Sequence, residues 1–228
     1  MKSKFQSPLF EQIKPSLISL GFSFYGEASL LPADPENTLL AGLEFFYEDR
    51  KLFRMLLRWC LSTSSLIHVE RLSKLAQKLD PALMPALEGL ALKLVKAGDR
   101  RFKLIVDQMK ASIKKHAIRL PEGYADPYLI AKQGIDPEFL EVGFTMALIQ
   151  PEDQKKILGL CDILKMNHWL KIRALVGANF RADLIFLLIQ KKVKNPNQAA
   201  KILCCSRETA YRLWREISLF EGIEKLAA

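Results

Sequence analysis

Hydrophobic residues along the chain recur with the spacing of amphipathic helices. Leu52, Leu56 and Trp59 fall at i, i+4 and i+7, and Leu184, Leu187 and Leu188 fall at i, i+3 and i+4, which also places them on one helical face. Sustained alternation of apolar and polar residues is scarce, and Asn-Gly or Asp-Gly hairpin turns are absent. The pattern predicts an all-α fold.

Proline after an acidic or amide residue marks the expected helix starts. The side chain of Asp or Asn can accept bonds from the first free backbone N–H groups, and proline suits the first helical position. Such pairs are Asp34-Pro35, Asp80-Pro81, Asp126-Pro127, Asp136-Pro137 and Asn195-Pro196. With the hydrophobic spacing they predict helices near 8–20, 35–48, 50–62, 67–79, 81–97, 99–115, 127–132, 137–149, 151–165, 167–177, 180–192, 196–203 and 207–220.

This order of elements predicts two parts. Residues 1–150 are expected to form one multi-helix domain, interrupted by a loop over 119–126 that contains Pro121 and Gly123. Residues 151–228 are expected to form a helical connector and a small C-terminal module. Nothing in residues 1–150 indicates a chemistry, so dimerisation, partner contact and signal sensing all remain open for them.

Positive charge is concentrated toward the C-terminus. The chain of 228 residues has a formal net charge of +9, and residues 163–216 contain eleven Lys or Arg against three acids. Such an excess favours a polyanion, either nucleic acid or an anionic membrane surface. The longest apolar run, Leu184–Ile189, is too short to span a bilayer, and we expect no membrane partner. Four cysteines without CxxC spacing indicate reduced thiols and a cytoplasmic protein.

The stretch 195–217 has the pattern of two helices joined by a tight turn. Asn195 and Pro196 begin the first helix, Cys204 and Cys205 form the turn, and Ser206 caps the second helix. The apolar residues of the first helix, Ala199, Ile202 and Leu203, are expected to pack on Leu184, Leu187 and Leu188 of the preceding helix. The second helix is expected to have an apolar inner face, formed by Ala210, Leu213, Trp214 and Ile217.

The opposite face of the second helix carries side chains suited to DNA. Arg207, Glu208 and Tyr211, with Thr209 at the margin, are the candidates for contacts to base edges in the major groove. Other nearby residues are better placed for backbone phosphates, which fix register without reading sequence. These candidates are Ser206, Arg212, Arg215, Lys191, Lys192, Lys194 and Lys201.

The sequence AAKILCCSRETAYR, residues 199–212, resembles the helix-turn-helix of bacterial transcription regulators. The common pattern is A-A-K-x-L-G-[apolar]-S-R-x-T-[apolar]-Y-R. Cys204 replaces the usual glycine, so the turn needs either a positive φ at Cys204 or a different geometry. Residues 172–184 are similar to the helix that precedes winged-helix domains in some regulators. Too few residues follow Leu219 for a complete β-hairpin wing, so the resemblance implies a truncated form.

No catalytic or metal-binding set is apparent. His68, His116 and His168 are far apart, lack zinc-ligand spacing, and are expected at the surface or partly buried. No GxSxG, GxxxxGK[ST] or GxGxxG motif occurs, and no cofactor is predicted.

Taken together, these patterns predict a cytoplasmic bacterial DNA-binding protein. It would be a transcriptional regulator that binds double-stranded DNA as a homodimer on paired half-sites. The alternative is a protein-interaction or antitoxin-like partner whose helical domain docks on another protein. An enzyme ranks third.

Overall fold

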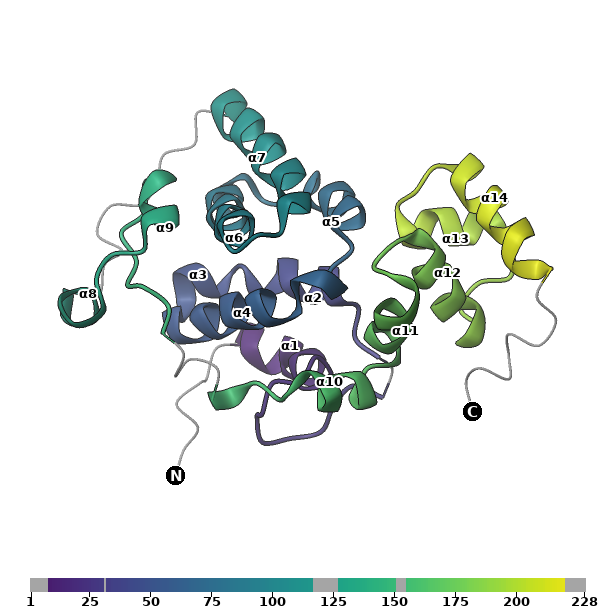
Figure 1. The fold of residues 1–228 in the computed structure, drawn as a ribbon, viewed down its shortest axis with the longest axis horizontal. Coiled ribbons are helices and arrows are strands. Elements are labelled where there is room, and N and C mark those ends of the chain that lie inside the picture. The colour runs from purple at the N-terminus through teal and green to yellow at the C-terminus, as the bar shows by residue number, and fades with distance from the viewer. Residues whose placement is uncertain (1–7, 31, 117–126, 151–154, 220–228) are drawn as a thin grey trace.

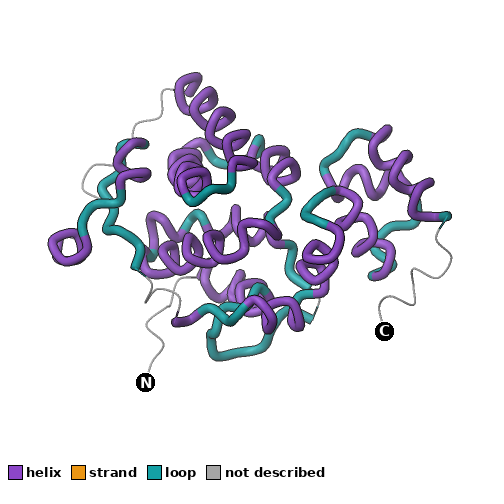
Figure 2. The backbone as a smooth tube through the Cα atoms, in the orientation of Figure 1, coloured by secondary structure: helices purple, strands orange, loops and turns teal. Residues whose placement is uncertain are grey.

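The computed structural model describes residues 8–30, 32–116, 127–150 and 155–219 (Figure 1). Within these ranges the only β structure is two isolated bridges, Phe22 with Ile157 and Ile135 with Ala147 (Figure 2). The predicted all-α class is therefore confirmed. The first α-helices are α1 (Pro8–Ser19), α2 (Pro35–Gly42), α3 (Phe45–Glu48), α4 (Arg50–Thr63), α5 (Val69–Ala76), α6 (Met84–Lys96) and α7 (Lys103–His116). They are followed by α8 (Pro127–Gln133), α9 (Pro137–Glu141), α10 (Leu160–Met166), α11 (His168–Val176), α12 (Phe180–Ile189), α13 (Pro196–Leu203) and α14 (Arg207–Ser218).

Side-chain caps begin several of these helices at the predicted positions. In each case the side chain of an Asp or Asn before proline accepts a bond from a backbone N–H in the first turn, which otherwise has no partner. The caps are Asp34 at α2, Asp136 at α9, Asn195 at α13 and, at the short 3-10 helix before α6, Asp80. Asp126 lies outside the described residues.

Three predicted helices differ from the structure. The range 35–48 is divided into α2 and α3 by a tight turn at the buried Leu43. α9 ends at Glu141 instead of near 149, because the chain turns at Gly143 with a φ of +87° and continues as an extended segment. α10 begins at Leu160 instead of near 151, because Ile157 pairs with Phe22 in an antiparallel bridge. Residues 151–154 lie outside the described residues.

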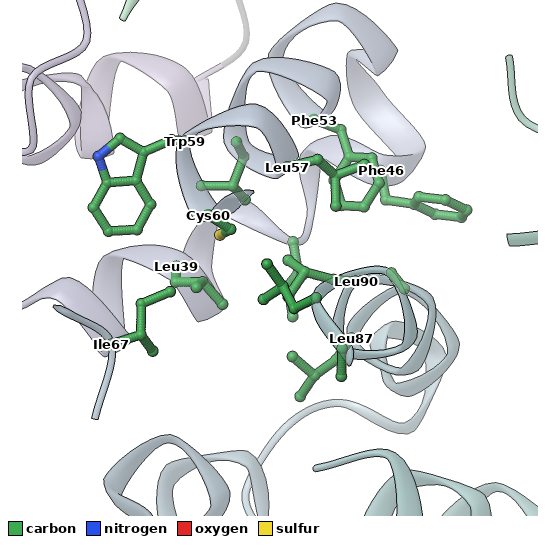
Figure 3. Close-up of a cluster of buried hydrophobic side chains, with 14 of the residues drawn as sticks. Leu39, Phe46, Phe53, Leu57, Trp59, Cys60, Ile67, Leu87 and Leu90 are labelled. Carbon is green, nitrogen blue, oxygen red and sulfur yellow. The ribbon is translucent and has the colours of Figure 1, made fainter. Parts of the chain in front are cut away.

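Buried side chains form two hydrophobic clusters. The first lies mainly among α1 to α10, which we call the N-terminal lobe. Figure 3 shows its centre, where Leu57 and Cys60 of α4 lie near Leu87 and Leu90 of α6, while Trp59 points away to the side, where its indole donates to the carbonyl of Leu20. The second cluster lies among α11 to α14, which we call the C-terminal module and which occupies one end of the molecule (Figure 1).

Helix α11 packs into both clusters. Its Leu170 belongs to the first cluster and its Trp169 to the second. Ile157 and Ile163, from the segment before α11, also pack into the first cluster. The division into domains at residues 150 and 151 stays a prediction, whereas the change from one cluster to the other falls within α11.

Candidate nucleic-acid interface

The turn between α13 and α14 consists of Cys204, Cys205 and Ser206. Cys204 ends α13 in the left-handed conformation, with φ 55° and ψ 35°, and its backbone N–H bonds to the carbonyl of Ala200. Of the two turn geometries expected when cysteine replaces the usual glycine, the structure has the one with a positive φ at Cys204. Ser206 follows in an extended conformation, and its hydroxyl accepts a bond of 3.1 Å from the backbone N–H of Thr209. This cap fixes where α14 begins.

The inner face of α14 is apolar and packs on α12 and α13. Ala210, Leu213 and Ile217 are buried, and Trp214 is half-buried against the second cluster. Leu184 and Leu187 of α12 and Leu203 of α13 lie in the same cluster, as predicted. Ile202 is the exception, because it is 39% exposed and faces away from the cluster.

The candidates for base contacts lie mostly on the outer face of α14. Arg207, Glu208 and Tyr211 are exposed. The hydroxyl of Tyr211 accepts a bond of 3.3 Å from Nδ2 of Asn197, on the first turn of α13. Thr209 is only half-exposed, and its Oγ1 accepts a bond from Ser206, so its polar atoms serve the cap. The outer face of α14 therefore presents a guanidinium and a carboxylate on its first turn and a phenol on its second.

The candidates for phosphate contacts are also exposed, and they divide into a group at α14 and a group of four lysines in and before α13. Arg215 and Arg207 form no ion pair with any described residue, so both guanidinium groups are available. Arg212 lies 3.7 Å from the carboxylate of Glu216, which also pairs with Arg181 of α12. Ser206 uses its hydroxyl in the cap of α14. Lys191, Lys192, Lys194 and Lys201 line a hollow that is described below.

A buried network of charged side chains fixes the base of the module, and the sequence did not reveal it. The carboxylate of Asp183 in α12 accepts bonds from Nε of Arg173 at 2.7 Å and from the indole of Trp169 at 2.6 Å. Nδ1 of His68, from the N-terminal lobe, lies 2.6 Å from the same carboxylate. Arg173 in turn donates to both oxygens of Glu36, at 2.6 and 2.8 Å.

The network continues into the N-terminal lobe through Arg71. Its guanidinium donates to Glu36 at 2.6 Å and pairs with Asp34, the cap of α2. The guanidinium groups of Arg71 and Arg173 lie 5.2 and 5.5 Å from the centre of the Trp169 ring, within the range of a cation–π contact. Residues from α2, α5, α11 and α12 are thereby joined by ion pairs at the boundary between lobe and module.

The charges of this network stabilise one another. Burial opposes the ionised form of Asp183, but Arg173 and His68 outweigh it and hold the pKa of this carboxyl well below its usual range. Burial likewise opposes the charged form of Arg173, and Glu36 and Asp183 outweigh it and raise its pKa. A carboxylate can only accept hydrogen bonds, so Nδ1 of His68 carries a proton toward Asp183.

The histidines do not form a common site. His68 is 2% exposed, which corrects the expectation of a surface or partly buried residue, and it serves the network. His168 is exposed, and the side chain of His116 lies outside the described part of the chain. Among the described residues, no group of three or more His, Cys, Asp or Glu side chains could hold a metal ion. None of the described helices is long and apolar enough to cross a membrane.

Comparison of the chain with protein-family models, with curated proteins and with solved structures finds no match. The geometry of the C-terminal module is therefore the main guide to function.

Proposed function

We propose that the protein is a DNA-binding transcriptional regulator that reads the major groove with α14. One observation supports this most strongly: α14 buries its apolar face against α12 and α13 while Arg207, Glu208 and Tyr211 are exposed on its outer side. A short helix held by a capped turn across a partner helix, with its N-terminal residues outward, is the arrangement of a recognition helix.

Each side chain on this face has a role in the proposal. The two N–H groups of the Arg207 fork can bond O6 and N7 of guanine together, and Glu208 can accept from the exocyclic amine of cytosine. Tyr211, oriented by Asn197, offers its ring and hydroxyl to the next base pair. Arg212 and Arg215, further along α14, contact backbone phosphates and set the register of the helix in the groove.

The proposal includes a homodimer in the bacterial cytoplasm. A single helix-turn-helix contacts only a few base pairs, and such modules gain affinity and specificity by binding paired half-sites about one helical turn apart. The N-terminal lobe would then carry the dimer contact, a partner contact or a sensing role.

Selection of duplexes from a random library, followed by binding measurements at several salt concentrations, tests the proposal. We expect an enriched sequence motif and an affinity that falls steeply with salt, because bound cations displace counterions from the phosphates. Arg207→Ala is expected to lose about 10- to 100-fold of the preference for the motif over random DNA. Arg215→Ala is expected to weaken binding to both duplexes alike.

Lys132→Ala is the matched control, because Lys132 is an exposed cation on α8, at the far end of the molecule from α14 (Figure 1). Its affinity and preference should equal those of the wild-type protein. Absence of an enriched motif, together with equal effects of the Arg207 and Lys132 substitutions, would contradict DNA reading by α14.

The second candidate is a protein-docking role, and an exposed apolar pair favours it. Tyr25 and Leu30 are 98% and 102% exposed in the segment between α1 and α2. Apolar side chains of this size, open to solvent on one loop, suit a partner protein. The selection experiment separates the two candidates, because a docking protein enriches no DNA motif.

A further inference from the structure

A hollow on the C-terminal module is lined almost entirely by lysines. It has a volume of about 360 Å³ and is bounded by Lys191, Lys192, Lys194, Gln198, Lys201 and Ile202. The first three come from the segment between α12 and α13, and the others from α13 itself. Four lysines therefore line one concave surface, and Nζ of Lys192 also lies 5.7 Å from the centre of the Phe186 ring.

None of these four lysines forms an ion pair with a described residue, although many other cations of the chain do. Arg71, Lys93, Arg173 and Arg181, for example, each pair with a carboxylate within the described residues. Unpaired cations at short range repel one another, and the repulsion falls when an anion enters between them. Lys191 and Lys192 follow the C-terminus of α12, where the helix dipole favours cations, which explains how the cluster is tolerated.

The backbone around the hollow is held in an unusual conformation. Lys191 has a φ of 52°, in the left-handed region that a side chain of its type rarely adopts. Its backbone N–H bonds to the carbonyl of Leu188, which closes the end of α12. The side-chain oxygen of Gln198 accepts a bond of 2.8 Å from the backbone N–H of Lys194, which ties this segment to α13. Because the oxygen is used, the amide group of Gln198 remains as a further donor for an anion.

The hollow lies on the exposed side of α13, and no residue of α14 lines it. The buried side of α13, with Ala199 and Leu203, packs on the module. Lys201 follows Asn197, the partner of Tyr211, by one helical turn, and Gln198 and Ile202 lie beside them. The exposure of Ile202 is explained by this position, because it lines the hollow beside the lysines instead of joining the second cluster.

We propose that the lysine hollow is a binding site for phosphate oxyanions, separate from the reading face of α14. Ammonium groups and an amide N–H are donors only, and phosphate oxygens are acceptors that match them. The phosphate belongs either to the DNA backbone beside the groove read by α14 or to a free phosphorylated molecule. The first source rests on the proposed function, and the second is independent of it.

A pair of charge-matched double variants tests the site. Lys194→Gln with Lys201→Gln removes one lysine from each side of the hollow and leaves Lys191, with its special backbone, unchanged. Lys165→Gln with Lys171→Gln removes the same charge from exposed lysines of α10 and α11, outside the hollow. Two probes are used with each protein: inorganic pyrophosphate alone, and a short and a long duplex that share the selected motif.

Two results of this experiment would support the site, each with a different source of phosphate, and a third would overturn it. Saturable binding of one pyrophosphate, weakened at least about tenfold in the hollow variant only, supports the site with a free phosphate as its source. A salt dependence on the long duplex that falls by about one unit of slope or more in the hollow variant only supports the site with a DNA phosphate as its source. The site is overturned when both variants behave alike with both probes.

The pyrophosphate result does not depend on the fate of the DNA-reading proposal. When no duplex binds the wild-type protein, the reading role of α14 fails, and pyrophosphate still tests the hollow. When Arg207→Ala loses motif preference while the hollow variant matches its control with both probes, DNA reading stands and the hollow fails alone.

Discussion

Asp183 is a carboxylate within a helix whose neighbouring residues are mostly apolar, and its partners explain how it is tolerated there. An ion removed from water without partners is strongly destabilising. Asp183 is fully buried, and its two oxygens meet Arg173, Trp169 and His68. The sequence offered one signal for this role, an isolated acid in the run RADLIFLLI, but it named no partner, because His68 lies 115 positions away.

We expect Asp183→Asn to lower stability at neutral pH by about 3–5 kcal/mol, because it leaves Arg173 and His68 without their anion. The low pKa of Asp183 means that its contribution is fully present above the ordinary carboxyl pKa of about 4. That contribution is lost as pH falls below this value toward the folded-state pKa. The difference in free energy of unfolding between the two proteins should therefore shrink from pH 5 to pH 3, measured by urea denaturation.

Asp162→Asn is the control for this pH dependence, because Asp162 is an exposed acid of α10, in the N-terminal lobe, and among the described residues its ion pair is with Lys165 at the surface. Its pH profile should follow the wild type. A gap between the wild type and Asp183→Asn that stays constant down to pH 3 would show that Asp183 is not held ionised by its partners.

Cys204 gives a second prediction at the scale of one residue. Its φ of 55° disfavours any residue with a Cβ by about 1–2 kcal/mol, whereas glycine adopts this conformation freely but loses more chain entropy on folding. Cys204→Gly should therefore raise the free energy of unfolding by about 0.5–1 kcal/mol. Thermal denaturation measures the change. Cys161→Gly, at an exposed helical position of α10 without a positive φ, should lower stability instead, and the prediction fails if both variants lose stability.

Among the secondary-structure elements, helix starts were more predictable than helix ends. Asp34, Asp136, Asn195 and Ser206 cap their helices as the sequence indicated, because a cap depends on residues only three positions apart. The predicted end of α9, near residue 149, was wrong because packing against other segments determines where this helix ends. Phe144 and Met146 alternate into the first cluster, and this short period-2 pattern after Gly143 is stabilised by one bridge, between Ala147 and Ile135, with two backbone hydrogen bonds.

The packing of α14 yields a prediction about what holds this element in place. Leu213 is buried in the second cluster, so Leu213→Ala should cost about 2–4 kcal/mol through lost burial and the cavity left behind. The exposed ion pair between Arg181 and Glu216 also links α12 to α14, but solvent screens it. Arg181→Gln should cost less than about 1 kcal/mol. Chemical denaturation of both variants checks the order, and a larger loss for Arg181→Gln would contradict it.

At the scale of the whole molecule, the buried network links the two hydrophobic clusters, because its ion pairs join the lobe to the module. Asp34, Glu36, His68 and Arg71 belong to the N-terminal lobe, and Trp169, Arg173 and Asp183 belong to the C-terminal module. No local pattern predicts contacts between residues so far apart in the chain. The outer face of α14 was predictable because its residues are neighbours on one helix, whereas the base that orients this helix exists only after folding.

Arg173 is the central link of this network, since its guanidinium reaches Glu36 of the lobe and Asp183 of the module at once. Arg173→Met keeps the length of the side chain but leaves two buried carboxylates short of a cation, at a cost of about 3–5 kcal/mol. This loss weakens the contact between lobe and module, so we expect one thermal transition for the wild type and two for Arg173→Met, one for each cluster. Calorimetry measures this, with Lys171→Met, an exposed change on the same helix, as the control that keeps one transition.

Arg173→Lys retains the charge but cannot bridge both carboxylates with a planar fork, so its transition should broaden without complete separation. A single sharp transition in Arg173→Met, shifted no more than in the control, would mean that apolar packing around Leu170 alone couples the clusters.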